Sequence, residues 1–248
     1  VNYHIPQPEQ PNGSCNFVAF VDEVTIPFKT SRPIDVVYTL DGSEPTPAST
    51  KYVEPLKFTE SATLKIRSVL PSGKMSPTRT ITVEKQALAP AKEVAEKKNG
   101  LNMKMAYGYY LNSEELAKAT DWKELTIEKL RDIRSQEPTW ENMRGVKYYS
   151  AIATGYVEIP EDGVYYISSD NEEVWIDGKL LVNNGGEVKR FSRKDSSAAL
   201  AKGKHEIKVV FLSHIIGGWP SAWNDGSVKL RKADAEKFTP IKAEQLFH

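Results

Sequence analysis

The sequence has few of the residues that build cross-links and metal centres. Cys15 is the only cysteine among 248 residues, and there are four histidines. A single cysteine excludes an intrachain disulfide and any metal site made of several thiolates. The fold must therefore be stabilised by packing.

An excess of charge of either sign is also missing. The 33 Lys and Arg residues balance 33 Asp and Glu residues, so the formal net charge is zero. No long-range field draws such a chain to nucleic acid or anionic lipid, and we expect no nucleic-acid partner. Apolar runs are only a few residues long, far short of the ~20 that a membrane-spanning helix needs. The first residues lack the profile of a signal peptide. We therefore expect no membrane span.

What the sequence does contain predicts two folded domains. Hydrophobic residues make up 40% and charged residues 27% of the chain, as in a globular protein. Eleven of the fifteen prolines lie in residues 1–90, whereas all five tryptophans lie beyond residue 120. We predict one domain over residues 1–85, a linker over 86–99 and a second domain over 100–248. The linker is rich in Ala, Lys and Glu, which indicates a semi-rigid segment with some helical tendency after Pro90.

Both domains have the pattern of β-structure. Short β-rich runs separated by turn signals predict strands at 16–21, 24–28, 35–40, 52–58, 62–70 and 79–83, then at 148–159, 163–169, 173–176, 179–182, 197–201 and 204–212. One short helix is expected from Ser113, as N-cap, to Ala119. Hairpin turns are predicted at Asp162-Gly163, Asp177-Gly178 and Asp225-Gly226. The expected fold class is all-β: a small immunoglobulin-like sandwich and a larger antiparallel β-sandwich with one short helix.

The first domain carries the motif Val37-Tyr-Thr-Leu-Asp-Gly-Ser-Glu-Pro-Thr-Pro-Ala-Ser-Thr-Lys-Tyr52, followed by Thr63–Val69 and Gly73–Pro77. Over residues 15–85 it resembles the chitobiase and β-hexosaminidase C-terminal domain family. The resemblance implies an immunoglobulin-like sandwich that follows the catalytic barrel in family 20 glycoside hydrolases.

The second domain resembles the protective-antigen fourteen-kilodalton domain family over residues 100–232. This family consists of β-sandwiches found as accessories to glycosidases, adhesins and toxins. The resemblance is carried by Thr154–Tyr166, Ser168–Asn171, Val174–Lys179, Leu200–His205 and the Gly217-Gly218 loop.

A calcium site is the first function that this second resemblance implies. In carbohydrate-binding members, an Asp-Asp pair at the position of Asp170-Asn171 holds a calcium ion that ligates sugar hydroxyls. In this sequence Asn171 stands in place of the second aspartate, and Glu172 stands in place of the glycine that usually follows. Because calcium prefers several oxygen ligands with two or more carboxylates, we expect no cofactor and disfavour calcium. Asp170 and Asn171 remain candidate carbohydrate-binding residues.

The loop from His214 to Gly226 is the better candidate for sugar recognition. Aromatic faces cover the apolar side of a pyranose, while amides and carboxylates match its hydroxyls. The candidate residues are His214, Trp219, Trp223, Asn224 and Asp225. The alternative is that both indoles pack at the end of the sandwich or against the neighbouring domain, and the frequency of buried tryptophan favours it.

No catalytic pattern stands out in the sequence. A glycosidase needs two carboxyl groups about 5 to 10 Å apart in a cleft. The adjacent acids Asp22-Glu23 and Glu161-Asp162 lie at turns, and no alternation of strands and helices predicts a barrel. For His205 the family resemblance implies an edge or packing role. We expect no catalytic residue and no enzymatic activity in this chain.

Together these observations predict a non-catalytic accessory region of a carbohydrate-active enzyme, most simply a β-N-acetylhexosaminidase. Its role would be carbohydrate binding, domain scaffolding or both. The expected partners are a glycan and a covalently attached catalytic domain, and the families imply an extracytoplasmic location. The alternative is a cell-surface adhesion or structural module without an attached enzyme.

Overall fold

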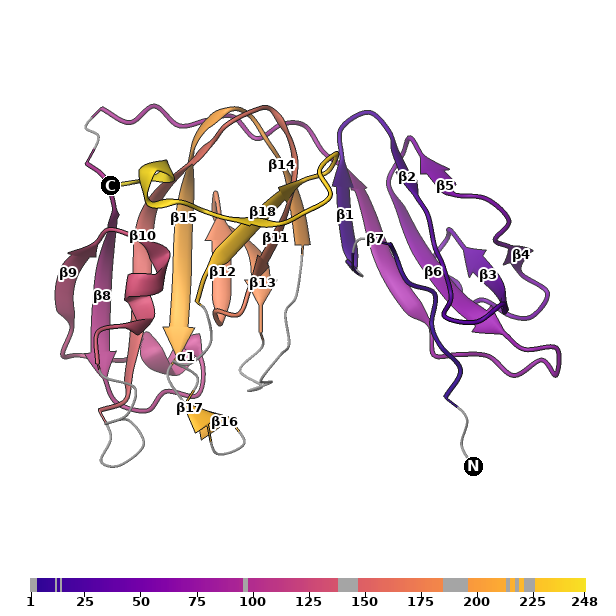
Figure 1. Cartoon of the computed structure of the whole chain (residues 1–248), viewed down its shortest axis with the longest axis horizontal. Helices are drawn as coiled ribbons and strands as arrows, with labels where there is room; N and C mark the ends of the chain where they lie inside the picture. Colours follow the sequence, from indigo (N-terminus) through magenta and orange to yellow (C-terminus); the bar gives the residue numbers. More distant parts are fainter. Residues whose placement is uncertain are drawn as a thin grey trace. The chain divides into compact units, whose positions relative to one another are not determined.

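The computed structural model describes residues 4–11, 13, 15–95, 98–137, 147–184, 196–212 and 226–248, and the backbone alone at 215–216 and 219–220. The chain divides into two compact units, residues 1–87 with 196–199 and residues 88–195 with 200–248 (Figure 1). Each unit is described separately below. The domain limits expected from the sequence, at 85 and 100, remain a prediction. No helix within the described residues is long and apolar enough to cross a membrane.

The first unit is built on a five-stranded sheet with the order β1-β7-β6-β3-β4. β1 pairs with β7 in parallel, and the other neighbours in this sheet are antiparallel. A second sheet consists of β2 and β5. The strands are β1 (Phe17–Phe20), β2 (Val24–Ile26), β3 (Asp35–Thr39), β4 (Thr50–Lys51), β5 (Leu56–Phe58), β6 (Ala62–Val69) and β7 (Arg79–Lys85).

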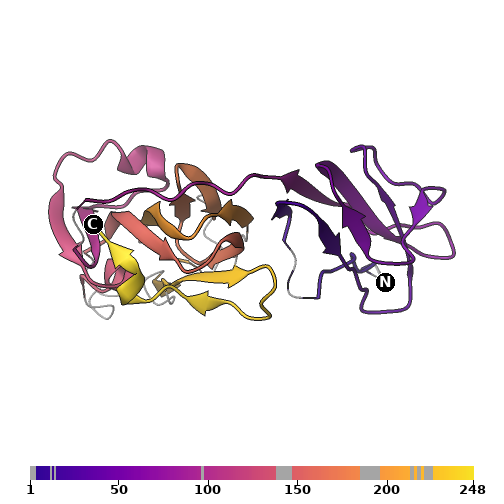
Figure 2. The same ribbon diagram turned by 90° about the horizontal axis from the view of Figure 1, so that it is seen from above.

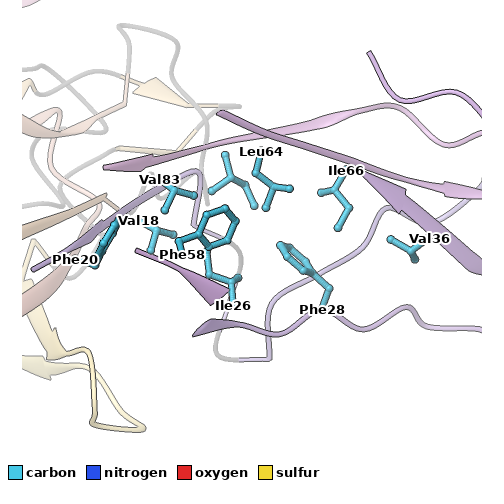
Figure 3. Close-up of a cluster of buried hydrophobic side chains, with 10 residues drawn as sticks. Val18, Phe20, Ile26, Phe28, Val36, Phe58, Leu64, Ile66 and Val83 are labelled. Atoms are coloured by element: carbon cyan, nitrogen blue, oxygen red, sulfur yellow. The ribbon is translucent and has the colours of Figure 1, made fainter. Parts of the chain in front are cut away.

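The core of the first unit follows from the period-two alternation of its strands. In β6, Leu64 and Ile66 are fully buried, whereas Thr63, Lys65 and Arg67 point to the other face. Figure 3 shows the cluster that this inward face joins. Its buried members are Val18, Phe20, Ile26, Phe28, Val36, Phe58, Leu64, Ile66, Ile81 and Val83.

The second unit contains a seven-stranded sheet in which β13-β12-β15-β10-β8-β9 are neighbours and β20 also pairs with β10. Figure 1 shows β9, β8, β10, β15 and β12 side by side. These strands are β8 (Leu101–Tyr107), β9 (Lys123–Ile127), β10 (Tyr149–Ile159), β12 (Glu173–Ile176), β13 (Lys179–Asn183), β15 (Gly203–Leu212) and β20 (Leu246–Phe247).

In the second unit β11, β18 and β19 are neighbours in a further sheet, and β16 pairs with β17. Most of β14 belongs to the first unit. Figure 2 shows the C-terminal strands, in yellow, along one side of the second unit. The remaining elements are β11 (Gly163–Ser169), β14 (Ser196–Leu200), β16 (Ile215–Ile216), β17 (Trp219–Pro220), β18 (Val228–Lys232), β19 (Thr239–Pro240), α1 (Ser113–Leu116) and the 3₁₀ helices η1 (Leu130–Arg134) and η4 (Ala243–Gln245). The predicted all-β fold class, with several antiparallel sheets and one short α-helix in the described part, is confirmed.

Two turn predictions have different outcomes. Asp177 and Gly178 both have positive φ, 48° and 76°, as a type I′ hairpin turn requires. Asp162-Gly163, in contrast, closes no hairpin, because it joins β10 to β11 and these strands belong to different sheets. A Cβ at Gly163 would lie 2.8 Å from Cε of Lys232, so a larger residue there would require the lysine side chain to move.

Two local predictions about helices were wrong. The N-cap of α1 is Asn112, whose side chain accepts a hydrogen bond from the Glu115 amide at 2.8 Å. Ser113 instead donates to Oε1 of Glu173 at 2.9 Å. The segment after Pro90 forms no helix within its described residues. It runs beside β15, where the Lys92 amide donates to the Lys204 carbonyl, and these tertiary bonds override a weak helical propensity.

Candidate functional site

The two described members of the predicted site lie directly after β11. Ser169 ends the strand, and Asp170 and Asn171 begin the turn that leads to β12. Asn171 is fully buried, whereas Asp170 is partly exposed. The strand and turn therefore bring a carboxylate and an amide to one point, as the sequence led us to expect.

Arg134 occupies the space between these two side chains. Its Nη2 donates to Oδ1 of Asp170 at 3.3 Å, to the Asp170 carbonyl at 2.9 Å and to Oδ1 of Asn171 at 3.0 Å. Its Nε donates to the same Asn171 oxygen at 3.3 Å. The guanidinium also lies over the ring of Phe211, 4.9 Å from the centroid. The buried guanidinium of Arg134 thus fixes both the Asp170 and the Asn171 side chains.

The 3₁₀ helix η1 delivers this arginine. Leu130 and Ile133 are buried beneath the helix, and Arg134 follows them with only 5% of its side-chain surface exposed. Sequence analysis missed Arg134, because an arginine that follows Leu130 and Ile133 is expected to be exposed at the end of a helix. The only sequence signal was its position one residue after Ile133.

Gly226 closes the site on the side of β18. Its amide donates to Oδ1 of Asp170 at 3.0 Å, and its carbonyl accepts from Nδ2 of Asn171 at 2.9 Å. Gly226 has φ of 70°, and a Cβ there would lie 2.7 Å from Cδ of Arg134. Glycine is therefore required both by conformation and by space.

The amide of Asn171 has a role that a carboxylate would not fulfil. Besides the Gly226 carbonyl, its Nδ2 donates to Oγ of Ser169 at 3.0 Å. An aspartate offers acceptors only, so it would face the Gly226 carbonyl without a proton between them. The departure from an Asp-Asp pair thus fits the hydrogen bonds of this chain.

These residues do not fit a calcium ion. Oδ1 of Asp170 and Oδ1 of Asn171, two oxygens that a hard cation would use, already accept hydrogen bonds from the guanidinium, and the former also accepts one from the Gly226 amide. Across the described ranges, no group of three or more His, Cys, Asp or Glu side chains is arranged to hold a metal ion. Asp170 instead forms a salt bridge with Arg134, and Asn171 accepts hydrogen bonds from the same guanidinium.

Tyr149 lies in the same buried layer. Its hydroxyl donates to the Ile133 carbonyl at 2.8 Å, and its ring packs edge-on against Phe211 with centroids 5.5 Å apart. Burial raises the pKa of Tyr149 to about 12. The phenol therefore remains a neutral donor that fixes the end of η1.

His205 has a structural position. It is fully buried in β15, and its Nδ1 lies 2.6 Å from Oδ2 of Asp177 while its Nε2 lies 2.7 Å from the Ala201 carbonyl. Both ring nitrogens are engaged by acceptors that belong to the neighbouring turns. This placement agrees with a packing role.

The structure does not describe the side chains of the other predicted site residues. His214, Trp223, Asn224 and Asp225 fall outside the described residues, and for Trp219 only the backbone in β17 is described. Their role in sugar recognition therefore stays a prediction.

Two families match this chain. Residues 97–242 match the PA14 domain, and residues 19–80 match the Chitobiase/beta-hexosaminidase C-terminal domain. The chain is also 47% identical over 247 residues to a protein named Beta-hexosaminidase from Porphyromonas gingivalis (strain ATCC BAA-308 / W83). The match covers 100% of this chain and 32% of that protein, so the chain spans about a third of its relative's length. Both family resemblances inferred from sequence motifs are confirmed.

Solved structures resemble this chain more distantly. An anti-sigma factor domain-containing protein matches with 15% identity and a TM-score of 0.44, covering 91% of this chain and 77% of that one. The PA14 domain of the MpAFP antifreeze protein matches with 15% identity and a TM-score of 0.38, covering 63% and 94%. At these TM-scores the likeness carries no argument about function.

Proposed function

The chain belongs to the PA14 domain family, and from this premise we propose that it is a non-catalytic accessory region of a β-N-acetylhexosaminidase. The observation that carries the proposal is the 47% identity to a beta-hexosaminidase along the whole chain, together with the match of residues 19–80 to the C-terminal domain of such enzymes. In this proposal the catalytic carboxylates belong to a covalently attached domain.

We further propose that the second domain binds carbohydrate. The support is the composition of the loop from His214 to Asp225, which combines Trp219 and Trp223 with an amide and a carboxylate. The guanidinium between Asp170 and Asn171 supports a mode of binding that does not depend on calcium. Scaffolding of the catalytic domain is the second role of the proposal, and it would use the same indoles for packing.

The proposal also covers organisation and location. Domains at 1–85 and 100–248 would each fold around a separate core, and the protein would act outside the cytoplasm. The alternative, an adhesion or structural module without an enzyme, is disfavoured by the match of residues 19–80 to a family that is named for hydrolases.

Binding of chitohexaose to the full chain, measured by isothermal titration calorimetry, tests the proposal. We expect binding that persists in a calcium chelator, and no hydrolysis of a chromogenic N-acetylglucosaminide. Trp219→Ala and Trp223→Ala test the loop, because loss of a stacking indole should weaken binding at least about tenfold. Turnover that disappears when an acid of this chain is substituted would contradict the accessory role.

A further inference from the structure

Among the described residues, α1 and the segment after it cover only part of the outer face of the seven-stranded sheet. Ala106, Val210 and Leu212 lie buried beneath Leu116 of α1, and Trp122 packs against the same cluster. Elsewhere on this face the strands present polar side chains. Lys104 and Asn102 of β8 are exposed, whereas the alternate residues of that strand are buried.

The uncovered part carries one row of residues that crosses five adjacent strands. In the strand register Trp175 of β12 is opposite Lys208 of β15, Lys208 is opposite Thr154 of β10, and Thr154 is opposite Asn102 of β8. Asn102 is in turn opposite Thr126 of β9. Neighbouring strands lie about 4.8 Å apart, which is close to the length of one sugar ring. The row therefore presents about one side chain for each sugar ring of a chain laid across the strands.

The surface along this row is hollowed. A hollow of about 580 Å³ is lined by Trp175, Lys208, Tyr156 and Glu206, and a second of about 500 Å³ by Lys104, Glu124 and Thr126 among others. Both are also lined by Asn102 and Thr154, so the two hollows meet at the centre of the row. The two adjoining hollows follow the row across the strands, and together they are called the trough below.

Trp175 is held in place at one end of the trough. Val174 and Ile176 are buried, so the alternation turns Trp175 to the outer face, where it is only partly buried. Its Nε1 donates to Oε2 of Glu173 at 3.1 Å, and Nζ of Lys208 lies 4.3 Å from the ring centroid. An aromatic group that is already ordered loses little conformational entropy when a ligand binds.

We propose that this row is a glycan platform that takes an unbranched chain of β-linked N-acetylhexosamine units laid across the strands. This inference rests on the proposed carbohydrate-binding function, but it assigns a site other than the His214 loop and the Asp170-Asn171 pair. Trp175 supplies the ring face opposite Lys208 as an apolar surface for a pyranose, and Asn102 pairs through its amide with hydroxyls or N-acetyl groups. Lys208 and Glu206 balance in charge, which suits a neutral sugar.

Chitohexaose binding to the full chain tests this assignment. We expect Trp175→Ala to weaken the dissociation constant at least about tenfold and Asn102→Ala about fivefold. Leu180→Ala is the matched control, because Leu180 lies opposite Trp175 on β13 but lines neither hollow, and it should leave affinity unchanged. Amide shifts in the NMR spectrum of the unsubstituted chain should cluster on β8, β10, β12 and β15.

The outcomes separate the two proposals. Binding that is unchanged in Trp175→Ala and Asn102→Ala but lost in Trp219→Ala would overturn the platform and leave the proposed function standing. Absence of chitohexaose binding by the unsubstituted chain would overturn both the platform and the proposed carbohydrate binding, and would leave scaffolding as the proposed role. Should Trp175→Ala fail to fold, Asn102→Ala and the NMR map still decide the question.

Discussion

Arg79 in the first unit and Arg134 in the second are buried arginines that each hold a segment distant in sequence, but their hydrogen bonds are satisfied differently. Arg79 of the first unit is 8% exposed, and Arg134 of the second is 5% exposed, so burial does not distinguish them. Arg134 forms a salt bridge with the Asp170 carboxylate. Among the described residues, the hydrogen bonds of Arg79 go to uncharged oxygens.

Those uncharged oxygens lie in the segment before β1. Arg79 donates to the Pro8 carbonyl at 3.0 Å, to Oε1 of Gln10 at 2.9 Å and to Oδ1 of Asn16 at 3.1 Å. Burial lowers the pKa of Arg79 from its ordinary value. Several neutral acceptors therefore suffice to hold a buried guanidinium. Where the acceptor is a carboxylate, substitution of the arginine should cost more folding free energy, because a buried charge is left unpaired.

The largest expected effect comes from removing the charged partner at the Asp170 site. Arg134→Met should destabilise the second unit by about 3 to 5 kcal/mol, because it leaves a partly buried carboxylate without its cation. Urea unfolding followed by tryptophan fluorescence reports on this unit, since all five tryptophans lie beyond residue 120.

Arg131→Met is the matched control, because Arg131 is exposed on the same 3₁₀ helix. It should change stability by less than about 0.5 kcal/mol. Equal effects of the two substitutions would show that the buried salt bridge contributes nothing specific.

A smaller loss is expected from Arg79→Met, about 2 kcal/mol, because the freed neutral oxygens carry a smaller desolvation penalty than a carboxylate. Hydrogen exchange of the β6 and β7 amides would measure it in the first unit. A loss as large as that of Arg134→Met would break the comparison, since the carboxylate would then not be the source of the difference.

High pH should weaken the second unit through Tyr149. Its pKa is about 12 in the folded chain, against an ordinary value of 10.0, so between these values the unfolded state loses the proton first. The phenol's contribution is complete below pH 10 and falls by about 2 kcal/mol as pH approaches 12. Tyr149→Phe should remove this component from the difference between the pH 9 and pH 12 unfolding curves. An unchanged difference would contradict the assignment.

The smallest expected effect is that of calcium. Because Arg134 already engages the Asp170 and Asn171 oxygens, neither added calcium nor a chelator should move the Tm of the second unit. A rise of Tm with calcium concentration would show that a cation competes with the guanidinium, and Arg134→Met would then be expected to enlarge that rise.

Local chemistry in the sequence determined most of the long strands, the Asp177-Gly178 turn and the two family resemblances. The alternation of Leu64 and Ile66 with polar residues follows from the pleat of a strand, and Asp177-Gly178 follows from the φ values that a type I′ turn demands. Both properties depend on residues that are adjacent in the chain. The strands β8 and β9 were not predicted, although Leu101, Met103 and Met105 alternate in the same way.

Only the tertiary structure decided which distant groups meet. Ser113 was expected to cap α1, but its hydroxyl bonds to Glu173, sixty residues away, and Asn112 takes the cap. Arg134 reaches Asp170 and Asn171 across 36 and 37 positions, and the residues beside it give no indication of that partner. The physical reason is that periodicity and turn propensity act over a few residues, whereas the partner of a buried polar side chain is selected by sheet packing and the requirement to satisfy its hydrogen bonds.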